Sequence, residues 1–421
     1  MLTFDYPEIV HQIAVLPGGL IPIWPDGKLA LAIKVSKEAL LTTRLNGGFS
    51  VYVVPIPAAD GITFGIVTAM FDDADEPLTI RTPLFGDEEH SVEIVGILMA
   101  PEVNIHFFDN VGREWMSYRC ELHDPGSFLK TSDSTRLLPF SPANSTAILN
   151  ILGEWFGLRT AEDDACAIKV KLCEELWPSD LAILDLRDDQ NEYLGSDGYA
   201  ISTLTRDAGR PGYYQERDIV ACLKRFLAPD QIILNPIRRG TDKEFVDVAA
   251  GTADSVLLIQ AKDSPNTALS LGRSIERKRL ASESQLKGAL KQVKGALRYA
   301  ADGDPIRLTT KHGDIDLHVH GRKILSVAII REIFPAQTAT IVQILREHAD
   351  RGQTLIVLDF PGFSAFVHHF PEEVRFVAEL EDYACALMSG NEWITPHAFL
   401  VGRFLDERAA REDGAGESDD P

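Results

Sequence analysis

EFVDVAAGTADSVLLIQAKDS, residues 244–264, carries the clearest structural signal in this chain. Its apolar run VLLI predicts a buried strand, and the preceding GTADS predicts a tight turn from the strand EFVDVAA. Polar residues Gln260 and Lys262 end the second strand, and Asp247 stands on the first. Because side chains on a strand alternate between its faces, Gln260 and Lys262 share one face, and Asp247 can approach them from the neighbouring strand.

The segments around this hairpin alternate between helix and strand. They predict a mixed sheet with helices packed on it. In the preceding helix, YYQERDIVACLKRFL, Glu216 shares a face with three apolar residues, Val220, Leu223 and Leu227. That face packs on the sheet, so Glu216 can also point toward the polar cluster. The predicted elements after the hairpin are a long helix over about 282–301 and then KILSVAII, TATIVQILREHAD and TLIVLDF.

This order of elements resembles the PD-(D/E)xK nuclease superfamily, with its restriction-endonuclease-like fold, over roughly residues 206–360. The Gln-x-Lys triplet resembles the variant found in Mrr-like restriction endonucleases. The resemblance assigns Asp247 to the first acid, Gln260 to the second ligand, Lys262 to the catalytic lysine and Glu216 to an additional helix acid. The chain departs from the motif twice: Val246 stands where the motif has Pro, and Gln260 replaces an acid, which lowers the negative charge of the site.

The implied activity is Mg²⁺-dependent hydrolysis of phosphodiester bonds in double-stranded DNA, with Mn²⁺ as an alternative ion. Mg²⁺ prefers oxygen ligands, which Asp247, the Gln260 amide, the Ala261 backbone carbonyl and Glu216 can supply. Lys262 would orient or help to deprotonate the attacking water and stabilise charge in the transition state. The resemblance also suggests a role in restriction or phage defence, and a homodimer, because cutting two strands usually needs two active sites.

The long helix predicts a surface for the DNA backbone. Basic residues form one stripe along it: Lys287, Lys291, Lys294 and Arg298. A row with Gln285 and Gln292 lies on the other side of its apolar stripe and could reach the metal site or the scissile phosphate. RSIERKR, just before the helix, predicts a loop or first turn with further phosphate contacts from Arg273, Arg277 and Lys278. Residues 271–298 carry a local charge of +6 in a chain whose net charge is −22, so this basic region is distinctive.

The whole chain predicts a multidomain α+β protein. Short β-branched segments such as GFSVYVVPIP, ITFGIVTAMF, SVEIVGILM and NIHFFDN predict a β-rich sandwich or barrel over residues 1–140, for recognition or assembly. Residues 141–205 predict a helical and mixed connector that includes a strand LAILDL. By the same resemblance, residues 206–406 are expected to form the nuclease-like domain, and the acidic tail 407–421 is expected to be disordered.

Two other functions remain open. Gln260 could mark a metal site that no longer cuts, which would leave a DNA-binding module, or the protein could be an oligomerising scaffold or sensor that works through its N-terminal domain. DIDLHVH, residues 314–320, aligns four potential ligands on one strand face, but a polar edge hairpin explains it better than a zinc site. Five scattered cysteines, with no secretion signal and no transmembrane segment, favour a cytoplasmic protein.

Overall fold

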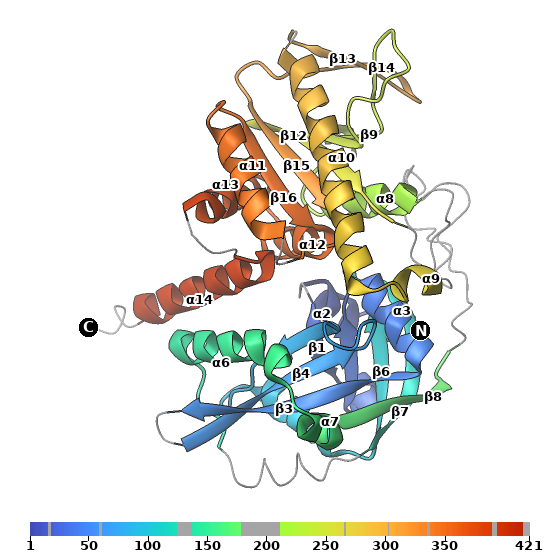
Figure 1. Cartoon of the computed structure of the whole chain (residues 1–421), viewed down its shortest axis with the longest axis vertical. Helices are drawn as coiled ribbons and strands as arrows, with labels where there is room; N and C mark the ends of the chain where they lie inside the picture. The colour runs from blue at the N-terminus through green and yellow to red at the C-terminus, as the bar shows by residue number, and fades with distance from the viewer. Residues whose placement is uncertain are drawn as a thin grey trace.

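The computed structural model describes residues 1–15, 18–58, 61–123, 136–177, 211–264, 267–301, 303–334, 337–389 and 394–415. Figure 1 shows a β-rich N-terminal domain below an α/β C-terminal domain, so the expected α+β architecture is confirmed. The predicted strand LAILDL lies outside the described residues. Within those ranges, no helix combines the length and apolar character needed to cross a bilayer.

The N-terminal domain is built on one eight-stranded sheet, in the order β1-β2-β6-β7-β8-β3-β4-β5. The end strands β1 and β5 also contact each other, so the sheet is nearly closed and barrel-like. The expected β-rich domain is therefore confirmed. Its strands are Gly19–Ile23 (β1), Ala30–Lys34 (β2), Gly48–Ala58 (β3), Gly61–Met70 (β4), Leu78–Thr82 (β5), Glu102–Phe108 (β6), Glu114–His123 (β7) and Ile168–Glu175 (β8).

Two features of this domain differ from the sequence prediction. SVEIVGILM is not a strand but most of helix α4, Glu89–Met99, because its buried residues Ser91, Ile94, Ile97 and Leu98 recur at helical spacing. The predicted connector supplies strand β8, which pairs with β7 and β3 inside the sheet. The other helices are Leu2–Asp5 (α1), Ile9–Val15 (α2), Lys37–Asn46 (α3), Pro142–Trp155 (α6) and Ala161–Cys166 (α7).

The C-terminal domain contains the mixed sheet that the sequence predicts, in the order β16-β15-β12-β11-β9. Strands β12, β15 and β16 run parallel, whereas β11 is antiparallel to both β12 and β9. These strands are Ile232–Leu234 (β9), Val248–Gly251 (β11), Ser255–Lys262 (β12), Lys323–Ile330 (β15) and Thr354–Asp359 (β16). A small second sheet joins Ile237–Arg238 (β10), Ile306–Thr310 (β13) and Gly313–Leu317 (β14).

Helices cover this sheet. Apolar residues of α8, such as Ile219 and Leu223, share a core with Leu257 and Ile259. The C-terminal half of α10 packs with Val256 and neighbouring residues in a second core, and Figure 1 shows α10 running the length of the domain. The helices are Pro211–Leu223 (α8), Ala268–Leu271 (α9), Ile275–Ala301 (α10), Thr338–Ala349 (α11), Phe360–His369 (α12), Glu373–Ser389 (α13) and Pro396–Ala415 (α14).

Two helices are longer than predicted. Helix α10 begins at Ile275, so most of RSIERKR is helical rather than a loop. Helix α14 continues to Ala415 through most of the tail expected to be disordered, because the Ala, Arg and Glu residues of DERAARED favour helix. Residues 416–421 lie outside the described residues.

A buried ionic cluster joins the two domains. Asp218 of α8 accepts hydrogen bonds from Lys37, at 2.7 Å, and from Arg113, at 2.8 Å, both in the N-terminal domain. Arg113 also pairs with Asp109 at 2.8 Å, and that carboxylate accepts from the Trp115 indole. The N-terminal domain therefore holds the helix that carries Glu216.

Candidate active site

Asp247 immediately precedes β11, at the same end of the sheet as the C-terminal end of β12. The pairing of Val248 with Ile259 places Asp247 opposite Gln260 on β12. The buried Asp247 Oδ2 accepts hydrogen bonds from Gln260 Nε2 and, at 2.6 Å, from the Ala261 backbone N–H. The sequence-predicted hairpin therefore does bring Asp247 and Gln260 into direct contact.

Glu216 of α8 approaches the same end of these two strands. Its Oε2 accepts a hydrogen bond from Asn235 Nδ2 at 2.9 Å. Asn235 has a positive φ of 50° between β9 and β10, a conformation that Asn tolerates better than most residues. The Asn235 N–H also donates to the Asp247 backbone carbonyl at 2.8 Å, so this one residue links Glu216 to the Asp247 segment.

Lys262 stands among three acids. Its positive charge favours the ionised form of Asp247, Glu216 and Glu244, and so partly offsets the effects that raise their pKa values. Glu244, at the start of the Asp247 segment, is not among the site residues predicted from the sequence. Its bridge to Ile237 of β10 brings it to this edge, and neither this bridge nor the Asn235 contact has a local sequence signal.

Burial governs the charge of this acidic cluster. It raises the pKa of Asp247 to about 7, against the opposing effects of the Ala261 N–H and Lys262. Partial desolvation also raises the pKa of the half-buried Glu216 and, although its side chain stays exposed, that of Glu244, and the negative charges of both acids add to the increase at Asp247. Three acids around one lysine leave the ionised site with excess negative charge, which a cation would neutralise.

The residues fit a hard divalent cation by their chemistry. No hydrogen bond from a described residue reaches Asp247 Oδ1 or Gln260 Oε1, so both oxygens can serve as ligands. The Ala261 carbonyl and Glu216 would complete an all-oxygen set. Across the described ranges, no three His, Cys, Asp or Glu side chains are placed to hold a metal, so a site here depends on the amide and the backbone as well.

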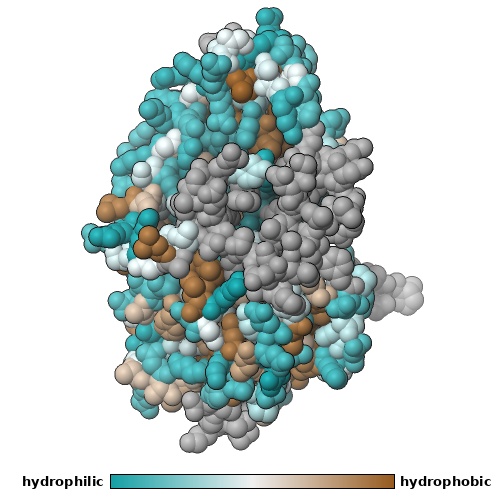
Figure 2. Space-filling model, turned by 90° about the vertical axis from the view of Figure 1, so that its right-hand side faces the viewer, coloured by the Kyte–Doolittle hydropathy of each residue, from teal (hydrophilic) through white to brown (hydrophobic). Residues whose placement is uncertain are grey.

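The predicted basic stripe lies exposed on α10. Lys287 pairs with Glu283 at 2.6 Å, whereas Lys291, Lys294 and Arg298 form no ion pair with a described residue. Gly288 faces the site, because a Cβ atom there would lie 3.8 Å from Lys262 Cε. At 3.6 residues per turn, the basic stripe runs along α10 about a quarter turn away from Gly288. Figure 2 shows a mostly hydrophilic surface on this upper domain, which suits a polar partner.

The other residues predicted to contact DNA or the metal site differ in their surroundings. Gln285 donates to Ser264 Oγ, and no hydrogen bond joins Gln292 to a described member of the acidic cluster. Lys278, predicted as a DNA contact, is instead paired with Asp72 of the N-terminal domain at 2.7 Å and is mostly buried. Arg273 and Arg277 are exposed, and their contacts to phosphate stay a prediction.

A pocket of about 270 Å³ opens between the two domains, next to this edge of the sheet. Ser264 and Gln285 line it, together with the half-buried acids Glu332 and Asp359. Burial raises the pKa of Glu332 to about 7 and that of Asp359 to about 6. The pocket therefore begins two residues beyond Lys262, at Ser264, and is not lined by Asp247, Gln260 or Lys262.

DIDLHVH forms an edge hairpin, as the sequence favours. Asp314 and Asp316 lie on β14 and pair with Arg239 at 3.2 and 2.7 Å. His318 and His320 follow the end of that strand. The two acids are therefore partnered by arginine rather than gathered with the histidines.

No protein-family model matches the chain, and no curated protein matches it at a significant level.

Proposed function

We propose that the C-terminal domain is a Mg²⁺-dependent endonuclease that hydrolyses DNA, as the PD-(D/E)xK resemblance implies. One observation carries the proposal: Asp247 is held by Gln260 and the Ala261 N–H at a sheet edge, with Lys262 and Glu216 directed to the same place. Order along the chain, strand register and electrostatics all agree with that chemistry. The exposed basic stripe of α10 supplies a path for the substrate.

The protein groups have distinct roles in this proposal. Asp247, Gln260, Ala261 through its carbonyl, and Glu216 would hold the metal. A bound Mg²⁺ would supply charge neutralisation at the phosphate and lower the pKa of a bound water. Lys262 would hold that water by a hydrogen bond and offset negative charge that develops on the phosphate oxygens. Asn235 would keep Glu216 oriented.

An inactive DNA-binding module is the second candidate, and a specific contact favours it. The hydrogen bond from Gln260 to Asp247 satisfies part of the carboxylate without any metal, which an acid at this position could not do when ionised. In that case the domain would bind DNA through α10 without cutting it. Restriction or defence, a homodimer and a cytoplasmic location remain further parts of the proposal.

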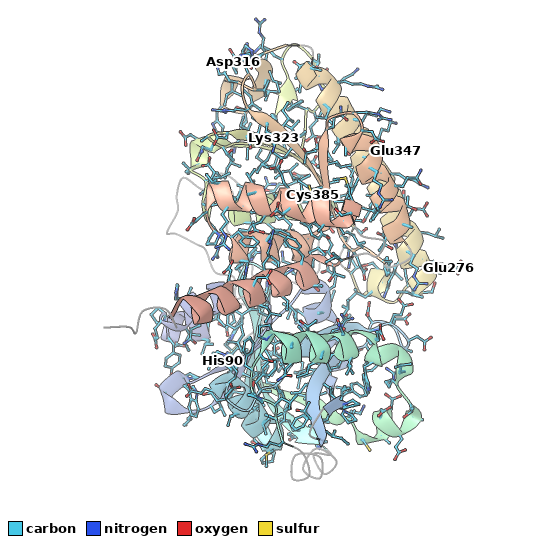
Figure 3. The ribbon with its side chains drawn as sticks, turned by 90° about the vertical axis from the view of Figure 1, so that its left-hand side faces the viewer. His90, Glu276, Asp316, Lys323, Glu347 and Cys385 are labelled. Carbon is cyan, nitrogen blue, oxygen red and sulfur yellow. The ribbon has the colours of Figure 1, made fainter. Side chains whose placement is uncertain are left out.

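Plasmid nicking tests the proposal. Supercoiled plasmid is incubated with the full chain and Mg²⁺ or Mn²⁺, and Lys262→Ala is compared with the wild type. Lys323→Ala is a matched control, because Lys323 begins the neighbouring strand β15 at the end opposite Lys262. Figure 3 labels this exposed lysine, which pairs with Glu381.

We expect metal-dependent nicking by the wild type and by Lys323→Ala. Lys262→Ala should lose at least about a hundredfold in rate, in line with the loss of one preorganised catalytic group, without a large change in melting temperature. DNA binding without cleavage under any divalent ion would favour the inactive module. No binding to DNA even at low salt would favour a scaffold or sensor and would overturn both nucleic-acid functions.

A further inference from the structure

Arg238 of β10 has a half-buried guanidinium group without a counter-ion. No ion pair or side-chain hydrogen bond joins it to a described residue, and its Nε is buried without a partner. The adjacent Arg239 differs, because it pairs with two acids of β14. The chain has a net charge of −22, so acids are plentiful, yet none of the described ones pairs with Arg238, and its guanidinium keeps donors for a ligand.

The guanidinium of Arg238 has a fixed position. Its central carbon lies 4.9 Å from the centroid of the Tyr299 ring, and the Tyr299 hydroxyl donates to the Arg307 carbonyl at 3.0 Å. Tyr299 also contacts Phe245, with the ring centroids 5.7 Å apart. Stacking on an anchored ring preorganises the planar donors of arginine for a ligand.

Helix α10 places this group in line with the candidate active site. A Cβ atom at Gly295 would lie 3.5 Å from Arg238 Nη2, just as one at Gly288 would lie 3.8 Å from Lys262 Cε. The two glycines are seven residues apart, so they lie on the same face of α10, separated by about 10 Å along its axis. Both cations therefore border one face of one helix, beside the exposed basic stripe.

Along α10, the direction from Lys262 to Arg238 leads away from the N-terminal domain. In Figure 3, Glu276 marks the end of α10 near that domain, and Asp316 marks the small sheet at the far end. Arg238 belongs to the small sheet through its pairing with Leu308 of β13. The small sheet is thus placed to extend the DNA path beyond the candidate active site.

We infer that Arg238 is a binding site for a DNA backbone phosphate that lies on the same strand as the scissile phosphate. This inference rests on the proposed endonuclease function and adds a second contact point for the substrate. Where the DNA axis runs along α10, each strand of B-DNA advances 3.4 Å per nucleotide in that direction, so a separation of about 10 Å along the helix corresponds to about three nucleotides. Arg238 therefore contacts the phosphate about three nucleotides from the cleavage position.

The test compares the salt dependence of DNA binding. A 30-base-pair duplex is titrated with full-length protein, without divalent ions, at several salt concentrations, and affinity is followed by fluorescence anisotropy. One lost phosphate contact lowers the slope of log affinity against log salt by about 0.9 and weakens binding about eightfold at 0.1 M salt. We expect this change in Arg238→Met, whereas Arg238→Lys should keep the wild-type slope because its charge remains.

Arg239→Met is the matched control. This change breaks the contacts to Asp314 and Asp316 on the small sheet, and it should leave the salt slope unaltered. An equal loss of slope in both variants, or a wild-type slope in Arg238→Met, would overturn the inference. A wild-type protein that does not bind the duplex would instead reject the proposed function itself.

A measurement on the wild-type protein covers the case in which Arg238→Met does not fold. Duplexes ethylated at single phosphates are sorted into bound and free fractions, and cleavage positions are mapped separately. Ethylation should interfere with binding at a phosphate about three nucleotides from the cleaved bond, given the same spacing. Free tolerance of ethylation at every phosphate two to four nucleotides away would show that no such contact exists.

Discussion

Asp218→Asn tests whether the buried ionic cluster holds the two domains together. The substitution keeps the shape of the side chain and removes its charge. Asp218 is 1% exposed and Lys37 is 8% exposed, so neither charge can return to water while the interface stays closed. Removing one partner from a buried pair costs about 3–5 kcal/mol. Because Arg113 retains Asp109, we expect a loss near the lower end, about 3 kcal/mol.

The assay is urea unfolding, followed by circular dichroism and by tryptophan fluorescence, since a chain with two domains can unfold in more than one step. The control is Glu283→Gln, which breaks the 2.6 Å pair to Lys287 on α10. That pair is exposed, with 47% and 72% of the two side chains accessible, so its loss should cost no more than about 1 kcal/mol.

A comparison of the two variants decides the question. If Asp218→Asn lowers the free energy of unfolding no more than Glu283→Gln does, the buried cluster does not stabilise the interface. Lys37→Met should also cost less in the Asp218→Asn background than in the wild type, because the two residues share one interaction. Additive losses would contradict that coupling.

Two further changes test local chemistry and packing. Burial raises the pKa of Asp247 to about 7, so its stabilising contribution is complete below about pH 4 and is lost as pH rises through about 7. Asp247→Asn should therefore be more stable than the wild type at pH 8 in thermal melts without divalent ions, with the difference vanishing near pH 4; lower stability at pH 8 would contradict this. A Cβ atom at Gly48 would lie 2.1 Å from the Val170 carbonyl oxygen, so Gly48→Ala should cost at least about 1–3 kcal/mol. Gly157→Ala, which meets no atom within 4 Å, should stay within about 0.5 kcal/mol, and equal unfolding midpoints for the two variants would refute the steric argument.

Local patterns determined most of the C-terminal domain. The apolar run of β12 and the turn before it predict the hairpin, and strand alternation predicts the contact between Asp247 and Gln260. These inferences succeed because period and turn chemistry act over a few residues. The same reasoning failed for α4, where a run of apolar residues was interpreted as a strand although its buried positions follow helical spacing.

Tertiary structure alone decided the rest of the site. Glu244 reaches the acidic cluster through its bridge to β10, and Asn235 reaches it with a positive φ. Lys278 forms an ion pair with Asp72 of the other domain. Strand β8 enters the first sheet between β7 and β3, far away in sequence. Such contacts join residues that are distant along the chain, and the neighbouring residues in the sequence carry no pattern that predicts the partner. The sequence alone determined the motif and its order, whereas folding determined which charges surround Lys262 and left the guanidinium of Arg238 stacked on Tyr299 without an ion pair to a described residue.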